Sequence, residues 1–217
     1  MARWRVASRL DGLHVSGLAN ARAHLADGPV VFASTHTSWW DPVVAMVLAE
    51  ALGGEHAFLM DAQNLARVRW FAALGALPLD RSSPAAARAG LRLGERSLSG
   101  PGRALWVFPQ GRQRPTWLRP LGVTRGAAWL AERTSADLVP VALAYGFREA
   151  PVPAAVVRFG EPCAAESLEV DLIDGLTAID RFLDDATTPG FEALVPSRQT
   201  REDDGLPSRA LSLLVGR

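Results

Sequence analysis

Short apolar runs that alternate with longer helical segments constrain the fold of this chain more than any other feature of its sequence. Turn-forming Gly and Pro residues separate the segments at short intervals. We expect strands at residues 30–33, 56–60, 77–79, 104–108, 138–145 and 154–159, and helices at residues 42–52, 64–74, 84–98, 125–132 and 168–185. Strands that alternate with such helices predict an α/β domain with a central, mainly parallel sheet flanked by helices.

Helix starts carry the clearest local signals. Asp41 followed by Pro42 predicts a capping residue with Pro at the first helical position, and Ser83 followed by Pro84 predicts a second start of this kind. Thr124 is expected to cap a third helix. Ligands of α/β folds bind in loops beyond the carboxyl ends of the strands, and the motifs described below fall on such loops.

Length and composition indicate one globular domain. A chain of 217 residues can bury a core without disulfides or metals, and 48% hydrophobic with 21% charged residues is a globular balance. The net charge of zero gives no indication of a nucleic-acid partner. We expect a single domain over residues 1–197 and a loosely held, charged C-terminal tail over residues 198–217.

No apolar segment of the sequence is long enough to cross a bilayer. The longest apolar stretches, residues 42–49 and 71–79, fall far short of the ~20 residues that a spanning helix needs. No signal peptide is visible, so we expect a cytoplasmic protein associated peripherally with the cytoplasmic face of the membrane. Trp4 and its neighbouring arginines fit a membrane surface and fit a solvated first helix equally well.

The cysteine and histidine content argues against several other chemistries. Cys163 is the only cysteine, which fits a reducing compartment, and no histidine or positive charge near it in sequence would activate its thiol. His14, His24 and His56 lack metal-ligand spacing, so we expect no metal. The chain has no Gly-rich phosphate loop or dinucleotide fingerprint, and we expect no bound cofactor.

His36 and Asp41 form the candidate catalytic pair. They are separated by four residues in the segment between an expected strand and an expected helix. On one helix this spacing would place them on different faces, but a strand-to-helix turn can fold back so that the carboxylate meets the imidazole. The carboxylate would then orient the ring, and the second ring nitrogen could accept a proton as a general base. By itself the spacing is also compatible with an ordinary histidine and a helix-capping aspartate.

The pair is accompanied by three further blocks, and together they resemble the glycerolipid acyltransferase family. The four blocks, in the order of the family, are His-x4-Asp at residues 36–41, a Gly-x4-Asp-Arg segment at 75–81, Phe-Pro-Gln-Gly at 108–111 and an apolar strand with Val-Pro at 138–143. With its flanking segments, the resemblance covers about residues 12–165.

The resemblance implies acyl transfer from a thioester to a hydroxyl group. His36 would take the proton of the acceptor hydroxyl and Asp41 would orient His36. The donor would be acyl-CoA or acyl-carrier protein, used as a co-substrate, and lysophosphatidic acid is the family's default acceptor. No acyl-enzyme is implied, which agrees with the missing Gly-x-Ser-x-Gly motif. Arg81 would bind the acceptor phosphate, as a guanidinium forks onto phosphate oxygens.

The third block departs from the family pattern. Gln110 replaces the usual Glu, so the side chain keeps its hydrogen-bonding capacity and loses its charge. Arg112 and Arg114 lie one residue to either side of the position of the usual Arg. With Gly111 in this block and Pro140 in the fourth, these residues are the remaining predicted substrate-binding residues. The departure leaves the acceptor open between a lysophospholipid and a related lipid, such as a glycolipid.

Two other functions fit the same residues. The His36–Asp41 pair could activate water, as in a thioesterase or lysolipid hydrolase. The altered third block could instead mark a non-catalytic lipid-binding protein, although retention of the pair argues against it. Trp39 and Trp40 add a hint of a membrane surface, where Trp is enriched, and ordinary core packing explains them as well.

Overall fold

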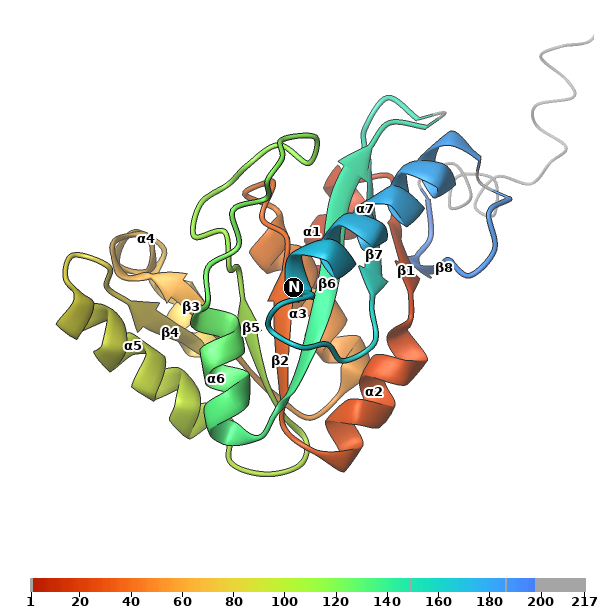
Figure 1. Cartoon of the computed structure of the whole chain (residues 1–217). Coiled ribbons are helices and arrows are strands. Elements are labelled where there is room, and N and C mark those ends of the chain that lie inside the picture. Colours follow the sequence, from red (N-terminus) through yellow and green to blue (C-terminus); the bar gives the residue numbers. More distant parts are fainter. Residues whose placement is uncertain (1, 149, 186, 198–217) are drawn as a thin grey trace, which may run out of the picture.

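A mixed, mostly parallel eight-stranded sheet forms the centre of the molecule (Figure 1). The computed structural model describes residues 2–148, 150–185 and 187–197, so the predicted tail over residues 198–217 lies outside the described residues. The strands are β1 (Leu13–Ser16), β2 (Val30–Ser34), β3 (Glu55–Asp61), β4 (Ala76–Leu79), β5 (Arg103–Val107), β6 (Asp137–Gly146), β7 (Ala154–Phe159) and β8 (Glu192–Val195). Their order in the sheet is β4-β3-β5-β2-β6-β7-β1-β8.

The parallel part of the sheet contains the strands that precede the candidate motifs. β4, β3, β5, β2 and β6 are parallel to their neighbours in this series, and β1 is parallel to β7. The β6–β7 and β1–β8 pairs are antiparallel. The predicted mainly parallel sheet is therefore confirmed, although β1 and β8 were not among the expected strands.

Helices cover both faces of the sheet. They are α1 (Ala2–Arg9), α2 (Leu18–Asp27), α3 (Asp41–Leu52), α4 (Ala62–Arg67), the 3-10 helix η1 (Arg69–Leu74), α5 (Pro84–Ser97), α6 (Gly126–Thr134) and α7 (Leu168–Asp184). Apolar side chains of α1, α2 and α3 form one core with one face of the sheet, and those of α6 and α7 form a second core on the other face. An α/β fold flanked by helices is confirmed.

The helix α3, which follows the His-Asp motif, is buried almost completely. Its apolar side chains from Val43 to Ala49 all lie in the core, and α1 packs against it with the buried side chain of Val6. A helix that is apolar on all sides is stable only when it is covered on all sides. The first helix is therefore not a freely solvated segment, although Trp4 on it stays exposed.

Three local expectations were wrong. Asp41 is the first residue of α3 and not its cap, because its carboxylate is engaged by His36 and the preceding turn. Thr124 donates a hydrogen bond to the carbonyl of Pro109 and caps no helix. The helix expected at residues 64–74 starts earlier, at Ala62, because the side chain of Asp61 caps it, and it is divided into α4 and η1 at Val68, whose backbone is not helical.

Candidate active site

Three of the four motifs end at one edge of the sheet, and the fourth lies within β6. The first follows β2, the second follows β4 and the third follows β5, and these strands run parallel. Carboxyl ends of parallel strands lie at the same edge, so the loops after them are neighbours in space. The long segment 108–125, green in Figure 1, extends beyond the end of β5.

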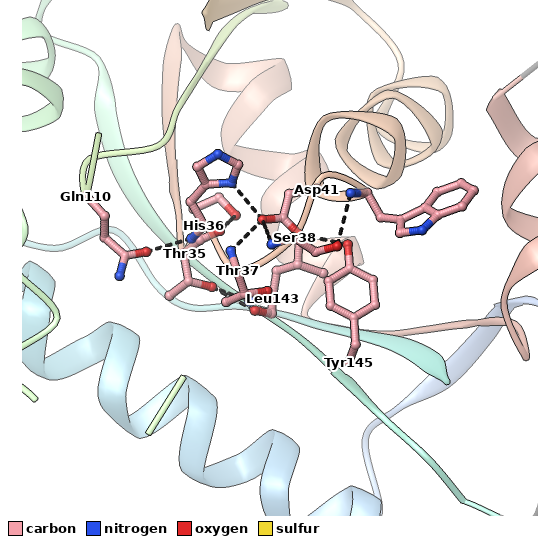
Figure 2. Close-up of polar contacts among 10 residues, drawn as sticks. Thr35, His36, Thr37, Ser38, Asp41, Gln110, Leu143 and Tyr145 are labelled. Atoms are coloured by element: carbon pink, nitrogen blue, oxygen red, sulfur yellow. Dashed lines mark hydrogen bonds and ion pairs between the residues drawn. The ribbon is translucent and has the colours of Figure 1, made fainter. Parts of the chain in front are cut away.

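The turn after β2 is fastened to β6 by Thr35. Its hydroxyl donates to the carbonyl of Leu143 at 2.9 Å and accepts from the Leu143 amide at 2.8 Å, as Figure 2 shows. The Thr35 amide donates to the carbonyl of Val141. The side chain thus replaces a backbone partner in the ladder where the chain leaves the sheet, and it sets the direction of the next residue, His36.

His36 and Asp41 meet as the sequence predicted. Nδ1 of His36 lies 2.7 Å from Oδ2 of Asp41 (Figure 2). The backbone amides of Thr37 and Ser38 donate to the same oxygen at 2.6 and 2.9 Å, so the turn closes around the carboxylate. With Nδ1 donating to Asp41, Nε2 is the acceptor nitrogen of the ring.

Asp41 is fully buried and its carboxylate accepts four hydrogen bonds. The fourth donor is the hydroxyl of Tyr145, which lies 2.7 Å from Oδ1. A buried carboxylate is stable only when donors replace its lost hydration. Burial raises the pKa of Tyr145 well above its usual range, and the charge of Asp41 raises it further, so the phenol keeps its proton and donates.

Tyr145 was not predicted as a site residue. It is the only tyrosine of the chain and it lies near the end of β6, two residues beyond the fourth sequence block. Its position suggested only the end of an apolar strand. The pairing between β2 and β6, which brings its hydroxyl to Asp41, is a long-range contact that local sequence patterns do not encode.

His36 lies on the wall of a pocket of about 610 Å³. Its ring packs against the ring of Phe108, which also lines the pocket, with centroids 4.6 Å apart. Most of the wall is apolar, and it is formed by Trp39, Pro42, Met46, Phe58, Leu59, Met60, Val68, Phe71, Leu79 and Phe108. Such a wall suits an alkyl chain more than a sugar or a nucleotide.

The same pocket carries a polar, basic part. Arg81 and Arg112, both predicted as substrate-binding residues, line it together with Arg67. Asp61 is the acidic residue of the lining, and its Oδ2 lies 3.4 Å from Nη2 of Arg81. The pocket therefore combines an apolar wall with an excess of positive charge, as an amphiphile with an anionic head group requires.

Gly111 also lines the pocket and supports the position of Arg81. Its φ of +66° is strained for any residue with a side chain, and a Cβ there would lie 2.5 Å from Nη1 of Arg81. The glycine therefore leaves room for the guanidinium. Arg67, Asp61 and the role of Gly111 as a spacer for Arg81 were not predicted from the sequence.

Gln110 contacts the turn at residues 36–41 and is not among the residues that line the pocket. Its Oε1 accepts from the backbone amide of His36 at 2.6 Å, and its Nε2 donates to the carbonyl of Leu121 at 3.2 Å. The amide therefore satisfies a donor and an acceptor at once. A carboxylate, which the family pattern has here, could accept from His36 but could not donate to Leu121.

The structure separates two other predicted residues from this pocket. Arg114 lines a second pocket, to which Thr37 and Ser38 of the turn at residues 36–41 also contribute. Pro140 is buried in β6, where its ring lies against Gly160. The structure therefore brings together His36, Asp41, Arg81, Gly111 and Arg112, and it leaves Arg114 and Pro140 apart from them.

Neither Cys163 nor a metal cluster among the described residues offers a competing centre. Burial, followed by the nearby Asp171, raises the pKa of the Cys163 thiol to about 11, which opposes formation of a thiolate. Within the described ranges, no three or more His, Cys, Asp or Glu side chains are arranged to hold a metal ion. The polar chemistry of this sheet edge therefore centres on the His36–Asp41 pair.

The comparison with protein families agrees with this geometry. Residues 12–144, more than half of the chain, match the family model described as Acyltransferase. The chain belongs to this family, which is the glycerolipid acyltransferase family. No curated protein matches the chain. In the described part of the chain, no helix has both the length and the apolar character that crossing a bilayer would require.

Proposed function

We propose that the protein transfers a fatty acyl group from an acyl thioester to a hydroxyl group of a lysophospholipid or related lipid. The observation that carries the proposal is the 2.7 Å contact between the buried Asp41 and His36, which lines a mainly apolar pocket. Family membership supports acyl transfer in general. The acyl-CoA or acyl-carrier protein is a co-substrate, and the reaction needs no resident cofactor.

The proposed reaction uses His36 as a general base and then as a general acid. Nε2 accepts the proton of the acceptor hydroxyl while its oxygen attacks the thioester carbonyl carbon. The tetrahedral intermediate breaks its C–S bond, and the departing sulfur takes the proton from the imidazolium. An ester and a free thiol result, without a covalent bond to the protein. Asp41 fixes the ring and stabilises the imidazolium while the proton is held.

The pocket supports an acceptor with a phosphate head group. Arg81 and Arg112 can direct guanidinium groups at phosphate oxygens, and Arg67 adds a third positive charge. The apolar wall can take an alkyl chain. Lysophosphatidic acid is the simplest lipid that combines a phosphate, a free hydroxyl and one chain, and we propose it as the first acceptor to test.

We also propose that the protein works at the cytoplasmic face of a membrane, bound peripherally. Its lipid substrates reside in membranes, and the half-exposed Trp39 lies at the pocket. Trp favours the interface between lipid and water, because its ring is apolar and its N–H is polar. No nucleic-acid partner is part of the proposal, since the net charge of the chain is zero.

Radiolabelled palmitoyl-CoA with a panel of lysophospholipids and glycolipids tests the proposal. We expect a labelled diacyl product from wild-type protein and a rate about 10²–10⁴-fold lower with His36→Ala, because a general base contributes about this much. His24→Ala is the matched control, since His24 is a histidine outside the pocket. Release of labelled fatty acid without an acceptor ester would instead identify a hydrolase. Absence of His36-dependent product with CoA and carrier-protein donors would leave a lipid-binding protein.

A further inference from the structure

A second pocket, of about 520 Å³, lies against the same catalytic turn. Thr37 and Ser38 of the turn contribute to its wall, as does Tyr145, the residue that donates to Asp41. Gln113 lines both this pocket and the one at His36. The two pockets are therefore neighbours, separated by the turn and by the segment after the third sequence block.

The charge of the second pocket is positive. Arg9 from α1 and Arg114 from the segment 108–125 line it, and none of the described residues in its wall is acidic. Neither arginine forms an ion pair with a described carboxylate. Arginine pairs of this kind bind phosphate oxygens with charge-assisted, often bidentate, hydrogen bonds.

Two polar atoms in the wall of this pocket are buried without a hydrogen-bond partner among the described residues. They are Oγ1 of Thr37 and Nε of Arg114. Buried polar atoms normally have a partner, and an orphaned donor costs about 1–3 kcal/mol. Both atoms are inaccessible to solvent as the side chains lie, and Nη2 of Arg114 donates to the carbonyl of Pro120 at 3.2 Å, so a ligand would satisfy them only after these side chains turn toward the cavity.

Aromatic rings form the rest of the recognition surface. Trp117 is 80% exposed although it is a large apolar side chain, and it lines the pocket with Trp40. Exposed Trp beside Arg is the combination that binds nucleotides, because a base stacks on the ring while the guanidinium holds the phosphate. The first pocket, by contrast, has a mainly apolar wall that suits an alkyl chain.

We propose that the second pocket binds the phosphorylated nucleotide of the acyl donor, as coenzyme A carries it. Arg9 and Arg114 hold the phosphates and Trp117 stacks on the base. The flexible arm of the donor then passes Gln113 and brings the thioester to His36. This inference rests on the proposed acyl transfer and deepens it, since it favours a coenzyme A donor over a carrier protein and assigns Arg114 to the donor.

Calorimetric titration with adenosine 3′,5′-bisphosphate tests the pocket directly. This probe contains the base and phosphates of such a nucleotide but has no thioester, so its binding is independent of catalysis. We expect saturable binding that weakens about tenfold or more in Arg9→Gln, Arg114→Gln and Trp117→Ala. Arg92→Gln, on α5 and outside both pockets, is the matched control that should bind as wild type does.

The result that overturns the proposal is absence of nucleotide binding, or binding that is equal in wild type and the Arg9 and Arg114 variants. Co-sedimentation with phosphatidylglycerol and phosphatidylcholine vesicles tests whether the pocket binds the phosphate of a lipid head group instead. If Arg9 and Arg114 control binding to the anionic vesicles while the nucleotide does not bind, the pocket takes a lipid head group and the nucleotide assignment is wrong. His36→Ala should retain nucleotide binding, so failure of the proposed catalysis is distinguishable from failure of this proposal.

Discussion

Tyr145, on β6, helps to fix the position of Asp41. Its hydroxyl donates to Oδ1, while the other oxygen accepts from His36 and two backbone amides. Loss of the phenol hydroxyl would leave one oxygen of a buried carboxylate without this donor. A hydrogen bond to a charged group contributes about 1.5–3 kcal/mol. Tyr145 therefore acts through Asp41, as a positioning residue.

We expect Tyr145→Phe to lower kcat by about tenfold with little change in KM. The substitution leaves the pocket at His36 unchanged in shape but lets the Asp41 carboxylate rotate away from Nδ1. Steady-state kinetics with the acceptor that the lipid panel identifies measures the effect. A purely structural role would lower the fraction of active protein and leave the kcat of the folded enzyme unchanged, which active-site titration would reveal.

Gln110 offers a test of the departure from the family pattern. We expect Gln110→Glu to lower the free energy of unfolding by about 1–3 kcal/mol, because a carboxylate cannot donate to the Leu121 carbonyl and is buried beside it. Urea unfolding measures the change. Gln113→Glu, an equal substitution at an exposed site of the same segment, should change stability far less. Equal losses in the two variants would contradict the role assigned to Gln110.

His56 is expected to titrate below its ordinary pKa of 6.5. Burial lowers the pKa, and the hydrogen bond to the Gly53 carbonyl offsets part of the effect. Nδ1 accepts from the indole of Trp106 at 3.1 Å, so protonation there would break this bond. An NMR titration of the imidazole signals should place the His56 pKa below 6.5. A value above 6.5 would contradict the preference for a neutral ring that burial and the bond from Trp106 imply.

The lowered pKa of His56 determines how the free energy of unfolding changes with pH. The unfolded chain binds the proton more tightly, so the contribution of neutral His56 is complete above pH 6.5 and is lost as the pH falls through the folded pKa. Between about pH 7.5 and about pH 5.5, the free energy of unfolding should fall more steeply for wild type than for His56→Asn. His14, whose pKa burial also lowers, is present in both proteins and cancels.

At the residue scale, the sequence predicted the His36–Asp41 contact but not what surrounds it. The spacing allowed a turn that folds back, and the turn does so. The sequence also predicts Asp41 as a helix cap, because Asp before Pro is usually one, but the backbone amides of Thr37 and Ser38 bind its carboxylate from the preceding turn. Gln110 and Tyr145 could not be placed, since their contacts join segments far apart in the chain.

At the scale of elements, α5 connects the second sequence block to the sheet. Gly90 lies against β4, and a Cβ there would lie 2.9 Å from the carbonyl oxygen of Pro78 and 3.1 Å from Cα of Leu79. Since these are backbone atoms, they cannot move aside as a side chain would. The close approach of α5 therefore holds the strand that ends just before Arg81.

We expect Gly90→Ala to destabilise the protein by about 1–2 kcal/mol, although alanine favours a helix over glycine by about 1 kcal/mol. The cost comes from pushing α5 away from β4. Gly126→Ala is the matched control on α6, where the nearest atom to a new Cβ is a side-chain carbon at 3.8 Å, and it should be neutral or stabilising. Urea unfolding of both variants decides the matter, and a stabilised Gly90→Ala would contradict the packing argument.

Elements with a strong local signal were predicted and those without one were not. The apolar run at residues 30–33 and the Ser83-Pro84 helix start both occur as expected, and the Ser83 side chain accepts from the Ala86 amide. The helix at residues 64–74 was expected to be continuous, because its apolar spacing gave no sign of the break at Val68. Asp61 directly follows the strand expected at residues 56–60, and no separate sign in the sequence indicates that its side chain caps a helix.

At the scale of the whole molecule, the α/β class followed from alternation alone, whereas the sheet order did not. β1 and β8 are short, and they form the far edge of the sheet through pairings with β7 and with each other. No local pattern announces such pairings. The consequence for function is large, because the order β4-β3-β5-β2-β6 assembles His36, Arg81, Gln110 and Tyr145 at one edge.

The placement of the pocket predicts how the molecule meets a membrane. Trp39 is 50% exposed, lines the pocket at His36 and packs edge-on against Trp40. We expect Trp39→Ala to weaken co-sedimentation with phosphatidylglycerol vesicles by about threefold to tenfold, because an interfacial Trp contributes through its apolar ring. The KM for an acceptor presented in vesicles should rise with it, while the KM for an acceptor dissolved below its critical micelle concentration should change less.

Val170→Ala is the control for this membrane prediction, since Val170 is an exposed apolar residue on α7 and does not line the pocket at His36. It should bind vesicles as wild type does. If the two variants bind vesicles equally and both match wild type, the edge that carries His36 is not the surface that meets the lipid. Substrate would then have to reach His36 by leaving the bilayer, and the rate should follow the concentration of free lipid and not the vesicle surface.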